Sequence, residues 1–207
     1  ELFIFSDAAK NKQSEEKVKK IRKYIKSIIG FKKIHIIIRK ENWGLAKSVI
    51  DGTTQIIKKY GKIIILEDDL ITSKRFLEYM NQGLHQYKTN KKIFSITGFN
   101  FNKNFLNIPE DYNKEIFYHK RPMSWSWGTW DDRWLNCDWE INNYADFLDD
   151  KEFINEFKKV GPDLPNMLKM QFSNKIDSWY VRFCYNAYKS RQLTVYPKES
   201  LISNLGH

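Results

Sequence analysis

Three adjacent carboxylates follow an uninterrupted apolar segment in the first half of the chain. Glu67, Asp68 and Asp69 come directly after the apolar residues 63–66, which are typical of a strand covered on both faces. Repulsion makes it costly to keep all three ionised unless a cation or hydrogen-bond donors compensate. Mg²⁺ and Mn²⁺ favour one or two carboxylates together with phosphate oxygens and water. The triplet alone fits a metal that bridges to a diphosphate, and equally a solvent-exposed turn in which Asp69 helps to cap the next helix.

Other acidic residues also stand at predicted ends of strands or helices. Asp7 follows the apolar segment 2–5, and Asp177 opens a predicted helix. An isolated aspartate at a helix start is usually an N-cap, so the position of Asp177 alone assigns no chemistry to it. Asp131 and Asp132 form a second acidic pair, which fits a helix start or exposed acids better than a second metal site.

Five tryptophans fall within one short stretch, at positions 125, 127, 130, 134 and 139. A core or interface role explains most of them, because indole rings bury a large apolar area. Flat indole faces also suit the C–H surfaces of sugars. One or two of these rings are therefore candidates for an acceptor site.

The elements that must position these residues alternate between short apolar segments and longer segments of helical period. Strands are expected at residues 2–5, 34–38, 63–66 and 93–96. The intervening helices are expected to start at Ser14 as N-cap, to cover 44–60, and to start at Thr72 or Ser73. This alternation predicts an α/β fold with an open, mostly parallel sheet and helices on both faces. Ligands of such sheets bind beyond the carboxyl ends of the strands, where Ser6-Asp7, the acidic triplet and Thr97-Gly98-Phe99-Asn100 are expected to lie.

The second half is less regular. We expect a strand at 116–119, a Trp-rich loop over 121–139, short acidic helices over 144–160, a loop around Pro162 and Pro165, a helix over 176–190 and a strand at 193–196.

Composition bounds the class of protein. The chain has 207 residues, which suits one domain, and its 42% hydrophobic and 29% charged residues exclude a wholly disordered chain. No apolar run approaches the ~20 residues of a membrane-spanning helix. The two cysteines, Cys137 and Cys184, lack metal-ligand spacing and favour a reducing compartment.

The formal net charge of +10 comes from 35 Lys and Arg against 25 Asp and Glu. The lysines are spread along the chain, which fits a solvated surface, or else a surface attracted to anionic lipid headgroups or phosphorylated substrates. We expect a cytoplasmic location, with peripheral contact at an anionic inner membrane face as the alternative, and no nucleic-acid partner.

Six segments in this order and spacing resemble the GT-A fold glycosyltransferases, in particular the family 2-like bacterial relatives of N-acetylglucosaminyltransferase I. The segments are Phe5-Ser6-Asp7, Asn42-Trp43-Gly44-Leu45-Ala46, Leu66-Glu67-Asp68-Asp69-Leu70, Thr97-Gly98-Phe99-Asn100, Trp125-Ser126-Trp127-Gly128 and Asp177-Ser178-Trp179. The resemblance implies a GT-A (Rossmann-like) fold and transfer of a sugar from a nucleotide-diphospho-sugar, most simply a UDP-sugar. It also implies Mn²⁺ or Mg²⁺ as cofactor and a saccharide or lipid-linked glycan as acceptor.

On the donor side, the resemblance implies one role for each acid. Asp7 is expected to hydrogen-bond the uracil base, Asp68 to meet the ribose, Glu67 to reach the donor sugar and Asp69 to ligate the metal. A turn residue remains the alternative for Asp7. His207 is a further candidate ligand for the metal.

On the acceptor side, Asp177 resembles the general base that deprotonates the acceptor hydroxyl, as an inverting displacement requires. Trp179 stands where the family has an aromatic residue beside that base. Trp127 and Gly128 fall in the segment that shapes the sugar pocket.

The chain departs from the family pattern at both ends. The pattern opens with a strand before Phe3, and a loop that closes over the diphosphate is cut at His207. We therefore expect a segment of a longer protein, with one GT-A-like domain over 1–207 that lacks its first strand. Residues 1–100 would form the nucleotide-sugar and metal half, and residues 101–207 the acceptor half.

Two other functions fit parts of the sequence. A nucleotidyltransferase would use the same carboxylates, but it would normally need a second, facing carboxylate and a Gly- or Lys-rich phosphate loop, and we find no such loop. A basic nucleic-acid-binding module would need stacking aromatics among basic residues, whereas most tryptophans here lie near acids.

Overall fold

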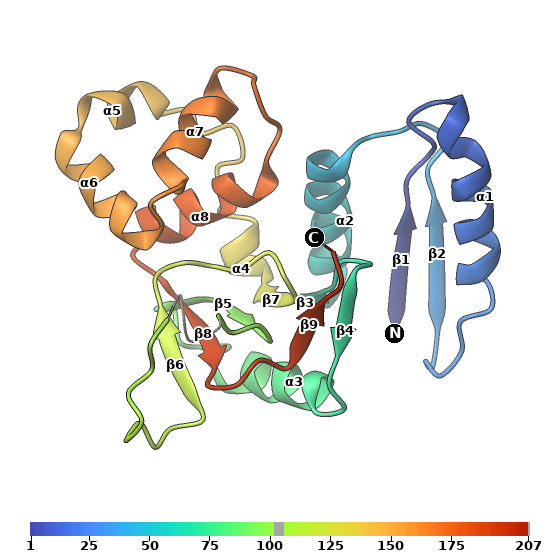
Figure 1. Ribbon diagram of the computed structural model, residues 1–207, viewed down its shortest axis with the longest axis horizontal. Coiled ribbons are helices and arrows are strands. Elements are labelled where there is room, and N and C mark those ends of the chain that lie inside the picture. Colours follow the sequence, from blue (N-terminus) through green and yellow to red (C-terminus); the bar gives the residue numbers. More distant parts are fainter. Residues whose placement is uncertain (102–105, 207) are drawn as a thin grey trace. The chain divides into compact units, whose positions relative to one another are not determined.

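The computed structural model describes residues 1–101 and 106–206 (Figure 1). The chain divides into two compact units, unit 1 from Glu1 to Gly52 and unit 2 from Thr53 onward. The boundary falls inside helix α2 (Leu45–Tyr60). Each unit is described by itself.

Unit 1 contains a parallel pair of strands, β1 (Leu2–Ser6) and β2 (Ile34–Ile38), joined by α1 (Lys12–Ile25). The strands are in register from Leu2 opposite Ile34 to Ser6 opposite Ile38. Both predicted strands and the helix between them are confirmed. A parallel pair of strands needs a crossover connection of this kind.

The start of α1 differs from the prediction. Asn11, not Ser14, is the N-cap, and the Ser14 backbone N–H donates to Asn11 Oδ1 at 3.0 Å while the Asn11 N–H donates to Ser14 Oγ at 3.2 Å. Ser14 is thus the third residue of the helix in a reciprocal capping box. The sequence pattern placed the start too late because either residue type suits an N-cap.

Unit 2 contains a five-stranded mixed sheet in the order β3-β7-β5-β8-β6. The strands are β3 (Lys62–Ile65), β7 (Trp127–Trp130), β5 (Ile93–Thr97), β8 (Leu193–Pro197) and β6 (Ile116–His119). Only the β5–β8 pair is parallel, and the other three pairs are antiparallel. The α/β class is confirmed, but this sheet is mixed rather than mostly parallel.

One strand of this sheet was missed, β7, which lies between β3 and β5 and falls within the segment expected to be a loop. Its four residues, two of them tryptophans around Gly128, are too short to show the alternation that identifies a strand. A Cβ on Gly128 would lie 2.9 Å from the Ile63 carbonyl and 3.2 Å from Met80. Glycine is therefore required where β7 passes between β3 and α3 (Phe76–Gln86).

Because β7 is antiparallel to both β3 and β5, these two strands point the same way, and β8 is parallel to β5. The carboxyl ends of β3, β5 and β8 therefore share one edge of the sheet. A small antiparallel ribbon lies beyond β3, made of β4 (Leu70–Thr72) and β9 (Ile202–Asn204). Neither ribbon strand was predicted.

Helix α3 packs Phe76, Met80 and Leu84 into the core with Ile93 and Ile96 of β5. Leu77, which was expected to face inward, is 49% exposed. The remaining apolar positions confirm the predicted helical face.

A helical layer completes unit 2 after the short helix α4 (Asp131–Trp134). It consists of α5 (Tyr144–Asp149), α6 (Lys151–Val160), α7 (Leu164–Phe172) and α8 (Trp179–Lys189), which share one apolar cluster (Figure 1). The acidic helices over 144–160 are confirmed. The loop expected around Pro165 is instead the start of α7, because proline is tolerated in a first helical turn. No helix in the described ranges is long and apolar enough to cross a membrane.

Candidate functional site

The acidic triplet lies in the turn between β3 and β4. The Asp69 carbonyl accepts the Leu205 N–H at 2.8 Å, which fixes the turn against the end of the ribbon. Burial, reinforced by the charges of Asp69 and Asp68, raises the pKa of Glu67 to about 7. The next helix begins at Phe76 with Arg75 at its N-cap, so Asp69 does not cap it. The structure favours a partly buried acidic site over a plain exposed turn.

Two buried oxygens at this turn and on the adjoining ribbon have no hydrogen-bond partner among the described residues. They are Asp69 Oδ1 and Asn204 Oδ1. A Cβ added to Gly206 would overlap Asp69 Oδ2 and lie 2.9 Å from Asn204 Oδ1. Gly206 therefore packs closely against oxygen atoms of both side chains. Since buried polar atoms are normally paired, the two unpaired oxygens are suited to bind a cation or a hydrogen-bond donor.

Asn204 was not among the predicted site residues. It reaches Asp69 because Asn204 pairs with Leu70 in the ribbon. No spacing in the sequence links positions 69 and 204, so the only signal was the acidic triplet itself.

Two more orphaned polar atoms lie at the same edge of the sheet, Asn100 Oδ1 and Ser126 Oγ. Asn100 Nδ2 donates to the Lys198 carbonyl at 2.5 Å, which ties the end of β5 to the end of β8. The Gly98 N–H donates to the Ser126 carbonyl at 3.1 Å. Ser126 has a φ of +48°, a conformation that costs a non-glycine residue energy and is concentrated at functional sites.

The C-terminal segment crosses this edge from β5 to β3. The Leu201 N–H donates to the Gly98 carbonyl at 2.8 Å, and the Leu205 N–H donates to the Asp69 carbonyl at 2.8 Å. The ends of β5 and β3 are thereby held by one strap, defined as residues 201–206. The predicted strand-end segments Glu67–Asp69 and Thr97–Asn100 are brought to this common edge.

Trp127 and Trp179 are brought together, but in the core. Their rings stack at a centroid distance of 5.3 Å, and the two residues are 0% and 3% exposed. They belong to an aromatic cluster with Trp134, Trp139 and Phe183. The core role expected for most of the tryptophans between 125 and 139 is confirmed for Trp127, Trp130 and Trp134, which are fully buried. Trp127 also pairs with Ile65 at the end of β3. The role of Trp127 and Gly128 in shaping a sugar pocket stays a prediction.

Asp177 lies just before α8, and it does not cap that helix. Ser178 is the N-cap, since its Oγ accepts the Val181 N–H at 3.3 Å. The Asp177 carboxylate accepts instead from Arg182 Nη2 at 2.9 Å and is 68% exposed, whereas Arg182 is 11% exposed. The Arg182 guanidinium therefore fixes the orientation of the Asp177 carboxylate, which stays accessible to solvent.

Asp7 lies in unit 1, at the end of β1, where backbone groups surround its carboxylate. Oδ1 accepts from Ala8 N–H at 2.9 Å and Trp43 N–H at 3.0 Å, and Oδ2 accepts from Trp43 and Gly44 N–H groups at 3.0 Å. These bonds organise the segment that enters α2. They support the reading of Asp7 as a turn residue, and the predicted contact to a base stays untested.

The remaining sequence candidates play other parts. Asp131 begins α4, as expected for a helix start. Asp132 pairs with Lys91 and with Arg133, and these partners lower its pKa against the opposing effect of burial. His207 lies outside the described residues.

The donor set at the end of β3 fits a hard divalent cation. Within residues 1–101 and 106–206, no three His, Cys, Asp or Glu side chains cluster closely enough to hold a metal ion by themselves. The Asp69 carboxylate and the Asn204 amide oxygen are both hard oxygen donors. Mg²⁺ is typically held by one or two carboxylates plus substrate phosphates and water. These residues therefore suit a cation shared with a bound phosphate.

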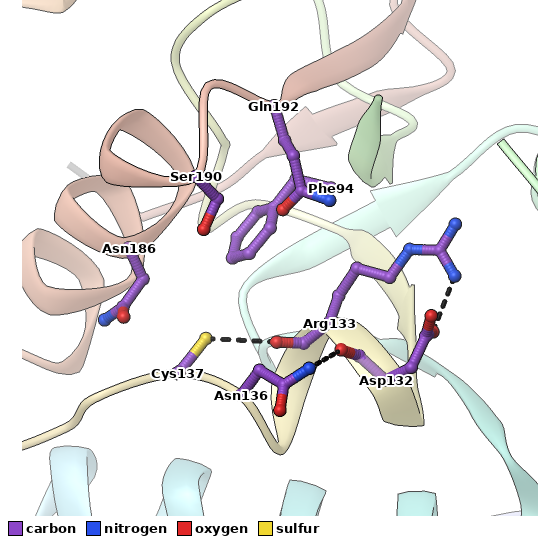
Figure 2. Close-up of a pocket in the computed structure, with 8 residues that line it drawn as sticks. All are labelled: Phe94, Asp132, Arg133, Asn136, Cys137, Asn186, Ser190 and Gln192. Carbon is purple, nitrogen blue, oxygen red and sulfur yellow. Dashed lines mark hydrogen bonds and ion pairs between the residues drawn. The ribbon is translucent and has the colours of Figure 1, made fainter. Parts of the chain in front are cut away.

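The opposite edge of the sheet holds a cavity of about 190 Å³, shown in Figure 2. Its polar groups are largely satisfied. Arg133 donates to the Ile93, Tyr87 and Asn90 carbonyls, Asn136 donates to the Asp132 carbonyl, and the Cys137 thiol donates to the Arg133 carbonyl at 3.4 Å. Burial raises the pKa of Cys137 to about 12, which leaves it a neutral thiol rather than a nucleophile.

No protein-family model matches this chain, and no curated protein matches its sequence significantly. The relationship to GT-A glycosyltransferases therefore stays a prediction that rests on the six sequence segments.

Proposed function

We propose that this chain is a metal-dependent glycosyltransferase that moves a sugar from a nucleotide-diphospho-sugar, with UDP as the expected nucleotide, to a saccharide or lipid-linked glycan. The observation that carries the proposal is the pair of orphaned buried oxygens, Asp69 Oδ1 and Asn204 Oδ1, beside the acidic triplet. Ligands of open α/β sheets bind beyond the carboxyl ends of the strands. The common edge formed by β3, β5 and β8 supports a donor site of the GT-A kind at this place.

The donor would be held by residues of this edge. A bound Mn²⁺ or Mg²⁺ would offset the charge that develops on the leaving diphosphate. Asp69 and Asn204 would hold that cation. Glu67, with its pKa near 7, would accept or donate a hydrogen bond to a sugar hydroxyl at neutral pH, and the exposed Asp68 would meet the ribose.

Asp177 would act as the general base. Its exposed carboxylate would take the proton from the acceptor hydroxyl while that oxygen attacks the sugar's anomeric carbon, and Arg182 would fix its orientation. A chain of contacts supports its proximity to the donor site. Trp179 follows Asp177 by two residues and stacks on Trp127, which pairs with Ile65 at the end of β3.

We also propose a cytoplasmic protein with peripheral contact at an anionic membrane surface. The net charge of +10 supports this contact, because anionic headgroups attract basic surfaces.

The proposed activity is tested by incubating the protein with Mn²⁺, a panel of UDP-sugars and mixed saccharide acceptors, and measuring released UDP. We expect acceptor-dependent release that Asp69→Ala and Asp177→Asn each reduce by at least about 100-fold, as the loss of a metal ligand or a general base does. Asp177→Asn should leave the affinity for UDP with Mn²⁺ unchanged, which separates a base from a donor-binding residue. Asp149→Asn, which alters an exposed acid at the end of α5, is the matched control.

The same assay separates the competing chemistry. Pyrophosphate release from UTP and a sugar phosphate, without UDP release from UDP-sugars, would replace the glycosyltransferase by a nucleotidyltransferase. Release of UDP at the same rate by Asp69→Ala would contradict the proposed site.

A further inference from the structure

A cavity of about 430 Å³ lies at the amino end of β8. Since β8 points the same way as β3, this is the edge of the sheet opposite the acidic triplet. The cavity is lined by Lys120, Phe153, Tyr188, Lys189, Arg191, Gln192 and Leu193. These residues come from the end of β6, from α6 and from the junction between α8 and β8.

Three of the side chains that line the cavity are basic. Among the described residues, Lys120, Lys189 and Arg191 form no ion pair. Two acids lie near its wall, and Glu156 interacts electrostatically with Lys120. Glu156 is paired with Lys159, and Asp150 caps α6 by accepting the Phe153 N–H at 2.8 Å. Three cations thus line one concave surface, and none of them forms an ion pair within the described residues.

The backbone around Arg191 is held in a conformation that favours glycine. The Arg191 N–H donates to the Tyr188 carbonyl at 2.9 Å and the Gln192 N–H to the Ala187 carbonyl at 3.1 Å, which is the Schellman motif at the end of α8. Arg191 occupies its left-handed position with a φ of +54°. Glycine is the usual residue there, and a bulky one is strained.

A second Schellman motif, at the end of α7, shows the ordinary solution. The Lys175 N–H donates to the Met170 carbonyl at 2.9 Å, and Asn174 takes the left-handed position with a φ of +54°. Asparagine tolerates this conformation better than arginine. A basic residue in the last turn would already stabilise the end of α8, and Lys189 supplies it. The arginine at position 191 is therefore not required by the helix end.

One wall of the cavity is aromatic. The rings of Phe153 and Tyr188 meet edge to face at 5.0 Å. A ligand that enters between this wall and the cations would be anionic at one end and apolar at the other.

We propose that this cavity binds a phosphate ester, with the phosphate held by Lys120, Lys189 and Arg191 and the apolar part of the ester against Phe153 and Tyr188. The site is separate from the acidic triplet and does not depend on the proposed transferase activity. The same chemistry is present in a soluble phosphate ester and in an anionic lipid headgroup.

The test follows the backbone amide resonances of Tyr188–Leu193 during titration with phenyl phosphate at constant ionic strength, with inorganic phosphate as the comparison. Saturable shifts are expected, with phenyl phosphate binding more tightly than phosphate. The double variant Lys189→Gln with Arg191→Gln should weaken binding at least tenfold. The control Lys169→Gln with Lys175→Gln removes two exposed charges of unit 2 and should change the affinity less than twofold.

Arg191→Gly separates function from helix capping. It should weaken phenyl phosphate binding and yet raise the melting temperature by about 2–4 °C, because it relieves the strained position. If the variant binds as tightly as the native chain, or if the control charges matter as much as the cavity charges, the proposal is overturned.

Vesicle cosedimentation identifies the source of the phosphate. Binding to phosphatidylglycerol vesicles but not to phosphatidylcholine vesicles, lost in the double variant, supports a lipid headgroup. Phenyl phosphate binding that the double variant abolishes, without any vesicle binding, supports a soluble ester. The proposal is overturned if phenyl phosphate causes no saturable shifts and the double variant still binds the vesicles.

Discussion

Asp7 and Asp69 both follow a β-strand, yet their carboxylates have opposite surroundings. Asp7 Oδ1 and Oδ2 each accept two backbone N–H bonds at 2.9–3.0 Å. Asp69 Oδ1 is buried without a hydrogen-bond partner in the described part of the chain, and so is Oδ1 of Asn204, which pairs with the neighbouring Leu70. A carboxylate whose oxygens all accept hydrogen bonds stabilises the loop around it. A buried carboxylate oxygen without a partner costs free energy until a cation or a hydrogen-bond donor binds to it.

The difference teaches how to separate two residues that look alike in the sequence. Both aspartates belong to segments that resemble the same family, and the resemblance implies a ligand for each. The geometry favours a structural role for Asp7 and a binding role for Asp69. The predictions below test this division.

The largest expected effect on stability comes from Asp7. Asp7→Ala removes the acceptor for three backbone N–H groups, and hydrogen bonds to a charged group contribute about 1.5–3 kcal/mol. We expect the free energy of unfolding of unit 1 to fall by about 2–3 kcal/mol. Denaturant unfolding followed by the indole N–H resonance of Trp43 measures it, since Trp43 is the one tryptophan of unit 1. A loss below about 0.5 kcal/mol is typical of an ordinary surface substitution. Such a result would show that Asp7 has no structural role.

The next effect is the pH dependence caused by Glu67. Its folded-state pKa is raised to about 7 from 4.5, so the folded chain binds the proton more tightly than the unfolded chain. The ionised Glu67 therefore destabilises the folded chain. This destabilisation is complete above pH 7 and is relieved as the pH falls through 7 towards 4.5. After allowance for the partial exposure of Glu67, we expect the free energy of unfolding to be about 1–2 kcal/mol lower above pH 7 than near pH 4.5.

Unfolding titrations at pH 5.5 and pH 8 measure this dependence. Glu67→Gln should remove it, and Mn²⁺ should reduce it, because a bound cation favours the ionised form. Equal pH slopes in the native chain and in Glu67→Gln would show that Glu67 does not titrate in this range.

A smaller effect is expected from adding a methyl group at Gly206, which is packed against Asp69. In Gly206→Ala the new methyl group would overlap Asp69 Oδ2, and we expect Mn²⁺-dependent UDP binding to weaken about tenfold, or ~1.4 kcal/mol. Ser203→Ala, which changes an exposed residue of β9, should leave the affinity unchanged. Native affinity in Gly206→Ala would place the cation elsewhere.

The smallest expected effect is on the stability of Asp69→Ala. Because Asp69 Oδ1 forms no hydrogen bond with any described residue and the triplet is self-repulsive, removing this carboxylate should change the free energy of unfolding by less than about 0.5 kcal/mol, or should increase it. Thermal unfolding without divalent ions measures it. A loss as large as that of Asp7→Ala would make Asp69 structural as well.

Local patterns predicted most of the fold, and contacts between distant residues account for what they missed. The apolar runs 34–38, 63–66 and 93–96 are strands because they are apolar and bounded by turns. In contrast, β7 is a strand because β3 and β5 pair with it on either side, and Trp127–Trp130 carries no alternation of its own. The ribbon strands β4 and β9 are three residues each and exist only as a pair.

The candidate site follows the same division. Glu67, Asp68 and Asp69 could be found from the sequence because three adjacent acids after an apolar strand are conspicuous. Asn204 could not, since an asparagine in the mixed segment 201–205 has no local feature that connects it with Asp69. The core positions of Trp127 and Trp179 likewise depend on helix α8 packing against β7.

The central claim is that the end of β3 binds a cation together with a nucleotide diphosphate. The most direct measurement is calorimetric titration of UDP into the protein with Mn²⁺, repeated with EDTA and with Asp69→Ala. The account predicts saturable binding that requires Mn²⁺ and that weakens by at least about 100-fold, or ~2.7 kcal/mol, in a variant that remains folded. Binding of equal strength in EDTA or in Asp69→Ala would contradict it.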